Sequence, residues 1–276
     1  MSNNPSIDSL SNSDVATSEL RVERVRHAFG ARHMQLMSRE IVSPGFMRLT
    51  LGGADLSDFN SAGFDDHVKL LLPAPGQEKP LLPRLVDGRP NFEGGERPVA
   101  RDFTPVRWDD GKGTMVLEFA LHDAGPAAQW AAQAQLGQWV GIAGPRGSMV
   151  VPKAFTWHWL LGDASALPAI ERRLAELPET AQATVRIQLD NAADRRALKT
   201  AANLDLQWVD SLNTAAQALV LPAGDGFIWA AGEHSDMAEL RRSVLAKPGV
   251  NAKRMRIAAY WKRGEVAHHA ELNDEA

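Results

Sequence analysis

A chain of 276 residues has room for one large domain or two moderate domains, each with its own core. Hydrophobic residues make up 44% of the chain and charged residues 23%, which is typical of soluble globular proteins. A formal net charge of -4 provides no overall attraction to nucleic acid or to an anionic membrane. The absence of cysteine excludes disulfides, thiolate nucleophiles and cysteine-ligated iron–sulfur clusters, so an electron carrier here must be a bound organic cofactor or a haem.

The start of the chain, residues 1–20, is polar and rich in Ser, Asn and Asp, and we expect it to be a mobile leader. It lacks the basic start and the apolar run of a secretory signal. No later window approaches a transmembrane length of unbroken apolar residues. We therefore expect no membrane span and a cytoplasmic protein.

The first half of the chain consists of short β-like runs separated by turns rich in Gly, Pro and Asp. The expected strands are Met34–Val42, Phe46–Leu51, His67–Leu72, Arg101–Trp108, Thr114–Leu121 and Trp139–Ala143. Residues 74–98 hold many Pro, Gly and charged residues and indicate a long surface excursion. Six short strands with tight turns predict a small antiparallel β-barrel.

The expected strand that begins at Arg101 carries an unusual mixture of side chains. Phe103 offers a flat apolar face, Thr104 a short hydroxyl, and Arg101 and Arg107 guanidinium groups that suit phosphate or an electron-rich ring. A planar, phosphorylated cofactor such as a flavin dinucleotide needs such a mixture. The alternative is an ordinary edge strand with solvated arginines.

Two glycine-containing turns follow as candidate phosphate contacts. Pro126 suits the first turn of a helix over residues 127–134, because the N–H that proline lacks has no partner there in any case. The free N–H groups of that turn can hold an anion, although many helices start in this way without a ligand. The second turn, Gly144–Ser148, contributes one arginine, Arg146.

The second half alternates strands with helices, which predicts a parallel sheet with helices on both faces. The expected strands are Trp157–Leu161, Val185–Leu189, Leu206–Val209, Phe227–Ala231 and Met255–Trp261. Ser165 is the expected cap of the first helix, which carries apolar residues at helical spacing up to Leu177. Ligands of such sheets bind at the carboxyl ends of the strands, where three glycine-containing loops begin at Gly162, Gly232 and Tyr260.

Several stretches together resemble one family, the siderophore-interacting proteins or ferric-siderophore reductases, a branch of the ferredoxin–NADP reductase-like flavoproteins. The resemblance is carried by Asp66–Leu70, Arg101–Arg107, His122–Trp130, Gly144–Ser148, Gly162–Ile170, Ala231–Glu233 and Tyr260–Glu265. We accordingly expect two domains, an N-terminal six-stranded antiparallel β-barrel that binds FAD (21–152) and a C-terminal α/β parallel-sheet domain that binds NAD(P)H (153–265). A polar tail (266–276) would follow them.

The resemblance implies particular cofactor contacts. For FAD these are Arg101, Phe103, Thr104, His122, Gly125, Pro126, Ala127, Trp130, Gly144, Arg146 and Ser148. For the nicotinamide nucleotide they are Gly162, Asp163, Ser165, Gly232 and Glu233. Trp261 is expected to pack beside the flavin. The alternative, for Tyr260 as well as for Trp261, is that the ring only closes the sheet.

The chain departs from the family pattern Arg-x-Tyr-Thr-x-Arg at two positions. Phe103 keeps the stacking face of the usual tyrosine but lacks its hydroxyl. Val106 stands at the second arginine position, and Arg107 lies one residue later, on the opposite face of a strand. Arg107 is therefore not expected to substitute, and FAD affinity or reduction potential is expected to differ from the family norm.

The preference between NADPH and NADH stays open. A cation near the ribose 2′-phosphate favours NADPH, and Arg195 and Arg196 are candidates unless they only line a solvated loop. Asp190 lies where an acid would favour NADH.

The implied reaction is hydride transfer from NAD(P)H to the flavin, followed by single-electron transfer to Fe(III) held by a siderophore. Reduction releases the iron because Fe(II) binds hard oxygen chelators less tightly, so neither a catalytic side chain nor a protein metal site is required. The candidate contacts for an anionic ferric siderophore are Lys69, Lys262 and Arg263, with ordinary surface charge as the alternative. His268 and His269 are adjacent and lack metal-site spacing.

Two competing functions remain open at this point. A flavin reductase of the same superfamily would pass electrons to or from a ferredoxin-like partner. A non-enzymatic siderophore-binding protein would use the basic cleft without redox chemistry. No nucleic-acid or membrane partner is expected.

Overall fold

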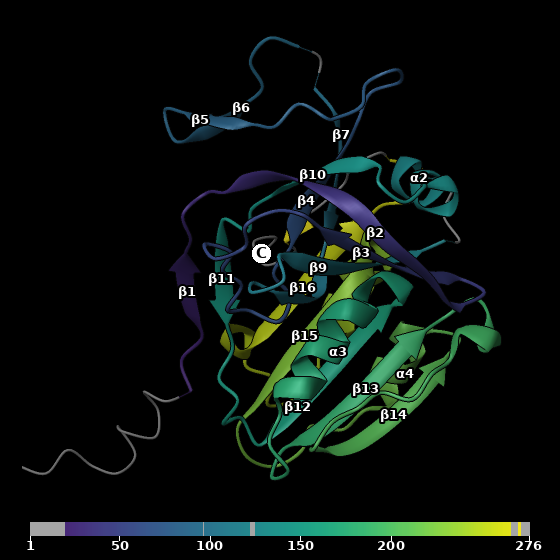
Figure 1. Cartoon of the computed structure of the whole chain (residues 1–276). Coiled ribbons are helices and arrows are strands. Elements are labelled where there is room, and N and C mark those ends of the chain that lie inside the picture. The colour runs from purple at the N-terminus through teal and green to yellow at the C-terminus, as the bar shows by residue number, and fades with distance from the viewer. Residues whose placement is uncertain (1–19, 96, 122–124, 266–269, 272–276) are drawn as a thin grey trace, which may run out of the picture.

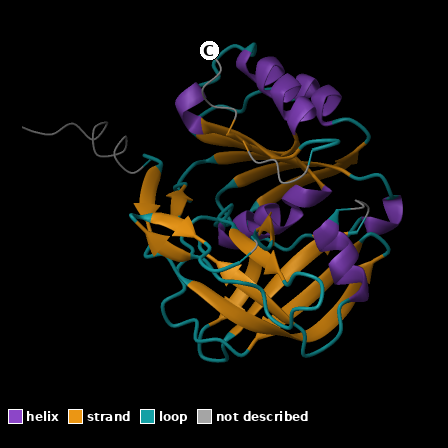
Figure 2. Cartoon of the chain, turned by 90° about the horizontal axis from the view of Figure 1, so that it is seen from above, coloured by secondary structure: helices purple, strands orange, loops and turns teal. Residues whose placement is uncertain are grey.

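The structure, a computed structural model, describes residues 20–95, 97–121, 125–265 and 270–271. A curled antiparallel sheet and a parallel sheet form two bodies, and helix α3 (Leu167–Glu176) lies between them (Figures 1 and 2). The expected order of a barrel followed by an α/β domain is therefore confirmed.

The antiparallel sheet has the strand order β7-β4-β10-β2-β3-β9-β8. Its strands are β2 (Ala31–Ser43), β3 (Phe46–Gly52), β4 (Val68–Leu72), β7 (Val99–Phe103), β8 (Pro105–Asp109), β9 (Thr114–Ala120) and β10 (Trp139–Ala143). The two edge strands, β7 and β8, are consecutive in the chain and are joined by Thr104 alone. The sheet must therefore curl until its edges meet at that residue.

This junction corrects the expectation of one continuous strand from Arg101 to Trp108. Phe103 ends the pairing with β4, opposite Val68, whereas Pro105 begins the pairing with β9, opposite Leu117. Proline has no N–H to donate and disfavours a helical conformation in the residue before it. The chain thus leaves one edge at Phe103 and joins the other at Pro105, which raises the strand number from six to seven.

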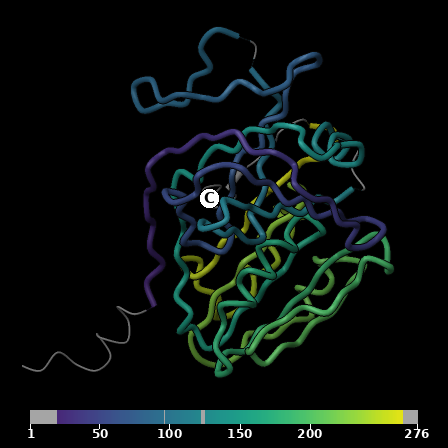
Figure 3. The backbone as a smooth tube through the Cα atoms, in the orientation of Figure 1, coloured from purple at the N-terminus to yellow at the C-terminus, as the bar shows by residue number. Residues whose placement is uncertain are grey.

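The expected surface excursion contains a short hairpin, β5 (Arg84–Val86) with β6 (Arg89–Asn91), which projects from the barrel (Figures 1 and 3). Its two-residue turn places Asp87 at φ 50° and Gly88 at φ 72°, the conformation that favours Asp-Gly in hairpins. A second small sheet pairs β1 (Glu23–Arg26) with β11 (Gly147–Val150). Helix α2 (Pro126–Gln133) confirms the predicted helix after Gly125.

The C-terminal sheet has the order β14-β13-β12-β15-β16-β17, and only β17 (Ala270–Glu271) is antiparallel. Its parallel strands are β12 (Trp157–Asp163), β13 (Gln182–Gln188), β14 (Asn203–Val209), β15 (Gly226–Glu233) and β16 (Met255–Trp261). Helix α3 covers the face toward the barrel, and α4 (Leu212–Ala218) and α5 (His234–Leu245) cover the opposite face (Figure 2). Among the described residues, no helix is both long enough and apolar enough to cross a membrane.

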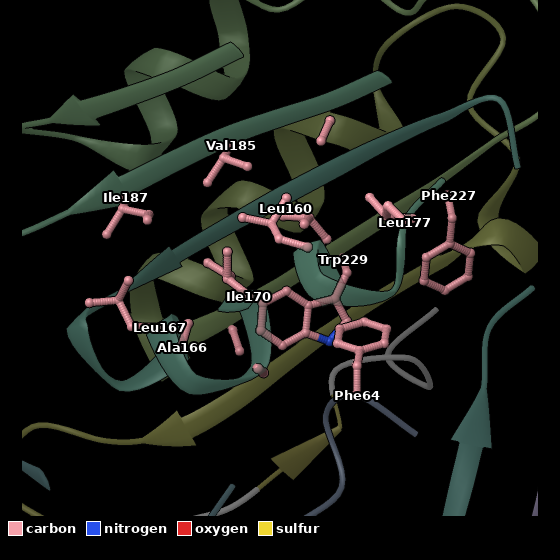
Figure 4. Packing of buried hydrophobic residues seen from close by; sticks show 14 of the residues in the cluster. Phe64, Leu160, Ala166, Leu167, Ile170, Leu177, Val185, Ile187, Phe227 and Trp229 are labelled. Atoms are coloured by element: carbon pink, nitrogen blue, oxygen red, sulfur yellow. The ribbon is translucent and has the colours of Figure 1, made fainter. Parts of the chain in front are cut away.

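Strand β12 alternates between two hydrophobic clusters with the period of a strand. Trp157, Trp159 and Leu161 pack toward α4 and α5, whereas Leu160 packs toward α3. The α3 cluster also takes in Phe64 from the barrel side of the chain, whose ring lies 5.5 Å from that of Trp229 (Figure 4). One hydrophobic core is therefore shared by both domains and fixes their contact.

Gly226→Ala should destabilise the α/β domain. An added Cβ would lie 2.0 Å from the indole ring of Trp157, which is 6% exposed and is held by a hydrogen bond from its Nε1 to the carbonyl oxygen of Gly224. We expect overpacking to lower the free energy of unfolding by about 1–3 kcal/mol in urea titrations. Gly95→Ala, with its nearest atom at 3.5 Å, is the matched control and should change it by less than about 0.5 kcal/mol. Equal midpoints for the two variants would contradict the packing account.

Candidate functional site

A cleft of about 580 Å³ lies between the barrel and the carboxyl edge of the parallel sheet. The barrel wall is formed from β7, the end of β9 and the start of α2, and the opposite wall from the loops after β12 and β16. The two halves of the chain therefore share one cleft, as the sequence predicted.

The barrel wall presents the side chains of the strand junction. Arg101, Phe103 and Thr104 all line the cleft, and the Phe103 ring packs 4.3 Å from that of Phe119. Burial lowers the pKa of Arg101, although the neighbouring Asp102 carboxylate opposes this effect. Arg107, in contrast, is exposed and does not line the cleft, as expected from its place on the other strand face.

Helix α2 opens onto the same cleft. Its N-cap, Gly125, provides no side-chain hydrogen bond, and a Cβ built at Gly125 would meet no atom within 4 Å. Pro126, Ala127 and Ala128 also line the cleft. The first turn of α2 thus lines the cleft, and the N–H groups of such a turn can bind a phosphate.

These groups fit FAD in chemistry and in size. An aromatic face, a partly buried guanidinium and an uncapped helix start are the contacts that an isoalloxazine ring and a diphosphate require. The volume lies within the range of small-molecule and cofactor sites.

The opposite wall is formed by Ala164, Ser165, Pro168 and the segment Tyr260–Glu265. The sequence suggested that Ser165 caps the following helix, and this prediction is wrong. Asp163 instead caps a short 3-10 turn over residues 164–166, and its carboxylate accepts the Ser165 N–H at 2.9 Å. Ser165 lies within that turn, which precedes α3, and the N-cap of α3, Ala166, has no capping side chain. Burial raises the pKa of Asp163, although hydrogen bonds from Ser165 and Trp261 oppose the shift.

Tyr260 connects the two walls. Its ring lies between the domains, 6.3 Å from that of Trp229, and it lines the cleft together with Thr104 of the barrel. Burial raises the pKa of Tyr260, and the nearby Asp65 carboxylate raises it further.

The three candidate substrate cations all lie at the cleft. Lys69 pairs with Asp102 at 2.7 Å, and Lys262 pairs with Glu265. Arg263 is exposed at the rim. The cleft therefore has cations on both walls, contributed by β4 and by the segment after β16.

Several other predicted contacts lie away from the cleft lining. Ser148 donates to Asp66 at 2.5 Å and accepts the Ala62 N–H, so its hydroxyl serves the loop before β4. Arg146 reaches the carbonyl oxygen of Gly88 in the hairpin. The remaining members of this group are Gly144, Trp130, Gly162, Asp163, Gly232 and Glu233. His122 and the His268–His269 pair lie outside the described residues.

Sequence reasoning missed a partly buried ion-pair network between the domains. Glu118 on β9, whose side chain is 1% exposed, pairs with Arg48 at 2.6 Å and with Arg196 at 2.5 Å. Glu171 on α3 pairs with the same two arginines, at 3.3 Å and 2.8 Å. Arg196, a candidate for the 2′-phosphate, is therefore engaged in this network, which we call the interdomain quartet. Its members are 70 or more residues apart in some pairs, and no local pattern indicates them.

Within the described part of the chain, no group of three or more His, Asp or Glu side chains could hold a metal ion. The candidate site is accordingly described by its cofactor-binding groups and cations.

Comparison with known proteins gives a consistent result. The model of the siderophore-interacting FAD-binding domain matches residues 35–149, and that of the siderophore-interacting protein matches residues 155–264. The NADPH-dependent ferric-chelate reductase of Escherichia coli is 35% identical over 246 residues, covering 87% of this chain and 96% of that protein. The ferric vibriobactin reductase of Vibrio cholerae is 27% identical over 253 residues, with coverages of 87% and 93%.

A solved structure agrees with this result. A siderophore utilization protein from T. fusca superposes with a TM-score of 0.81 at 30% identity, covering 90% of this chain and 99% of that chain.

Glu118→Gln should weaken the contact between the domains. The substitution keeps the shape of the side chain but removes one of the two carboxylates that Arg48 and Arg196 share. We expect the free energy of unfolding to fall by about 1–3 kcal/mol in urea titrations, since hydrogen bonds to charged groups are lost while Glu171 still compensates part of the charge of the two arginines. The exposed Glu179→Gln is the control, with an expected change below about 0.5 kcal/mol.

A cycle with Arg196→Gln separates the ion pair from loss of shape. If the double variant is as unstable as the sum of the two single variants, the quartet is not coupled and this account is wrong.

Proposed function

The chain belongs to the siderophore-interacting protein family, and on that premise we propose that it reduces the Fe(III) of ferric siderophores with electrons from NADPH or NADH through bound FAD. The observation that carries the proposal is the single cleft, whose barrel wall fits FAD and whose other wall is formed at the carboxyl edge of the parallel sheet. The proposed boundary between the FAD-binding and NAD(P)H-binding domains is residues 152–153, between β11 and β12.

In this proposal, Phe103 packs against the flavin ring, and Arg101 and the start of α2 at Gly125–Ala127 hold the diphosphate. Bound FAD would supply acceptance of a hydride from nicotinamide and delivery of single electrons to Fe(III). The chain's own residues supply the rest: they bind both cofactors, hold them on facing walls and limit water between them. The predicted contacts Gly144, Arg146 and Ser148 would act indirectly, through the loops that support this wall.

The nicotinamide nucleotide would lie against Ser165, Pro168 and Trp261. The Escherichia coli relative is NADPH-dependent, which supports NADPH as the donor. Because Arg196 is engaged in the quartet, the exposed Arg195 is the better candidate for the 2′-phosphate. A nicotinamide nucleotide as the electron donor supports a cytoplasmic location of the proposed reaction.

The ferric siderophore would approach the cations at the rim, Lys69, Lys262 and Arg263. Lys69 and Lys262 would exchange their carboxylate partners for the anionic chelate, whereas the exposed Arg263 would attract it and raise its local concentration. Reduction then weakens the chelate and frees Fe(II). Electron exchange with a ferredoxin-like protein is the competing proposal, and binding of a siderophore without redox chemistry is the other.

The proposal is tested with the purified protein under anaerobic conditions. We expect a flavin absorption spectrum that is bleached by NADPH, and formation of a coloured ferrous complex when a ferric siderophore and a ferrous-specific chelator are added. Bleaching without Fe(II) formation, together with reduction of an added ferredoxin, would favour the competing reductase. A protein that remains colourless after incubation with FAD would overturn both redox proposals and leave siderophore binding.

Arg101→Ala should weaken FAD binding, because it removes a partly buried guanidinium from the barrel wall. A lost charge-assisted hydrogen bond corresponds to an increase in the dissociation constant of roughly tenfold to a hundredfold, measured by fluorescence titration of the apoprotein. The matched control is Arg107→Ala, which removes the same side chain from an exposed position six residues later. Equal weakening by both variants would assign the effect to general charge and remove Arg101 from the proposed contacts.

A further inference from the structure

Two carboxylates, Asp163 and Glu233, lie behind the cleft at the carboxyl edge of the parallel sheet. Asp163 ends β12 and Glu233 ends β15, and neither lines the cleft. Both nevertheless hold residues that do line it, which gives them a role different from direct contact with a nucleotide.

Asp163 accepts hydrogen bonds on both of its oxygens. Oδ1 accepts from the N–H and the hydroxyl of Ser165, at 2.9 Å and 2.6 Å. Oδ2 accepts from the Glu233 N–H at 3.0 Å and from Trp261 Nε1 at 2.8 Å. One carboxylate therefore joins the ends of β12, β15 and β16.

Glu233 extends this connection. Its Oε2 caps α5 by accepting the N–H groups of Ser235 and Asp236, and its Oε1 accepts the N–H of Arg263 at 3.2 Å. Glu233 is only 4% exposed. The two oxygens of the Glu233 carboxylate thus hold the start of α5 and the backbone at Arg263, just after β16.

The packing around Asp163 leaves no space for another group on the Glu233 side. A Cβ added at Gly232 would lie 2.7 Å from Asp163 Oδ2. Glycine at this position allows the carboxylate to approach the backbone of β15 closely. The donors already present satisfy both oxygens, so a nucleotide hydroxyl would have to displace one of them.

We propose that Asp163 and Glu233 are positioning residues that clamp the segment Trp261–Arg263 against the cleft. Asp163 fixes the indole of Trp261, and Glu233 fixes the backbone from which the Arg263 side chain extends. The clamp is inferred from the hydrogen bonds that Asp163 and Glu233 accept within the chain. Its consequence for the substrate rests on the proposed function, in which Lys262 and Arg263 meet the ferric siderophore.

Asp163→Asn tests the clamp independently of activity. An amide must turn its NH2 group toward the donors of Ser165 or toward those of Glu233 and Trp261, so one set is lost. In hydrogen–deuterium exchange of the FAD-loaded protein, we expect the segment that loses its acceptor, either 163–166 or 232–234 together with 261–265, to exchange about tenfold faster. Asp190→Asn, at the exposed position after β13, is the matched control and should leave these peptides unchanged. Unchanged exchange in all of the peptides covering 163–166, 232–234 and 261–265 would overturn the clamp.

Trp261→Phe provides a second variant in case Asp163→Asn does not fold. It removes the Nε1 donor and keeps an aromatic ring, so exchange should rise at 261–265 and stay constant at residues 163–166. Unchanged exchange at 261–265 in this variant would also overturn the role of Asp163.

Glu233→Gln tests the substrate consequence. The remaining oxygen can still cap α5, while the amide nitrogen faces the Arg263 N–H and releases it. We expect KM for the ferric siderophore to rise about tenfold, with little change in KM for NADPH when a neutral quinone is the electron acceptor. If exchange at 261–265 rises while KM for the ferric siderophore is unchanged, the clamp holds no substrate contact. If wild-type protein reduces no ferric siderophore, the proposed function fails, whereas the exchange results still decide the clamp.

Discussion

The charges of the interdomain quartet, of which Glu118 is fully and the others are partly buried, orient the two walls of the cleft toward each other. Ionised groups lose hydration when they are buried, and only close partners compensate for the loss. Glu118 from the barrel and Glu171 from α3 share Arg48 and Arg196, so any rotation of one domain would separate these pairs. The contact of Phe64 with Trp229 adds apolar area buried between the domains, whereas the ion pairs of the quartet fix the relative orientation of the domains. Because Glu118 itself lines the cleft, the contact that orients the domains also borders the cofactor site.

Local patterns predicted the fold well because strand alternation and helix starts are set by neighbouring residues. The stretch around Thr104 could be predicted to contact a cofactor because its chemistry is contiguous, and these residues do line the cleft. The break at Thr104 was not recognised, because a single strand and two strands that meet at a corner have the same local pattern. The quartet could not be predicted either, since its residues come from distant segments and its arginines look like solvated surface.

The roles of Asp163 and Glu233 illustrate a different limit. A resemblance places such residues near the nucleotide, but it does not tell whether the oxygens face the ligand or the backbone behind it. Their hydrogen bonds are made across three strand ends, and this information exists only in the folded sheet. Arg107 could be judged from sequence because the question concerns which face of a strand its side chain takes. Arg107 is indeed exposed, and the barrel wall keeps Arg101 as its guanidinium.

Tyr260 is the only tyrosine in the chain, and it stands between the domains beside Thr104. A free phenol ionises near pH 10 and then absorbs at longer wavelength, but burial and the nearby Asp65 raise the pKa of this one. The neutral phenol is therefore favoured by the closed interface, and its contribution to stability is present below pH 10 and is lost as the pH rises above that value. Phenolate absorbance thus becomes an intrinsic optical gauge of domain separation, which needs neither a label nor a substitution.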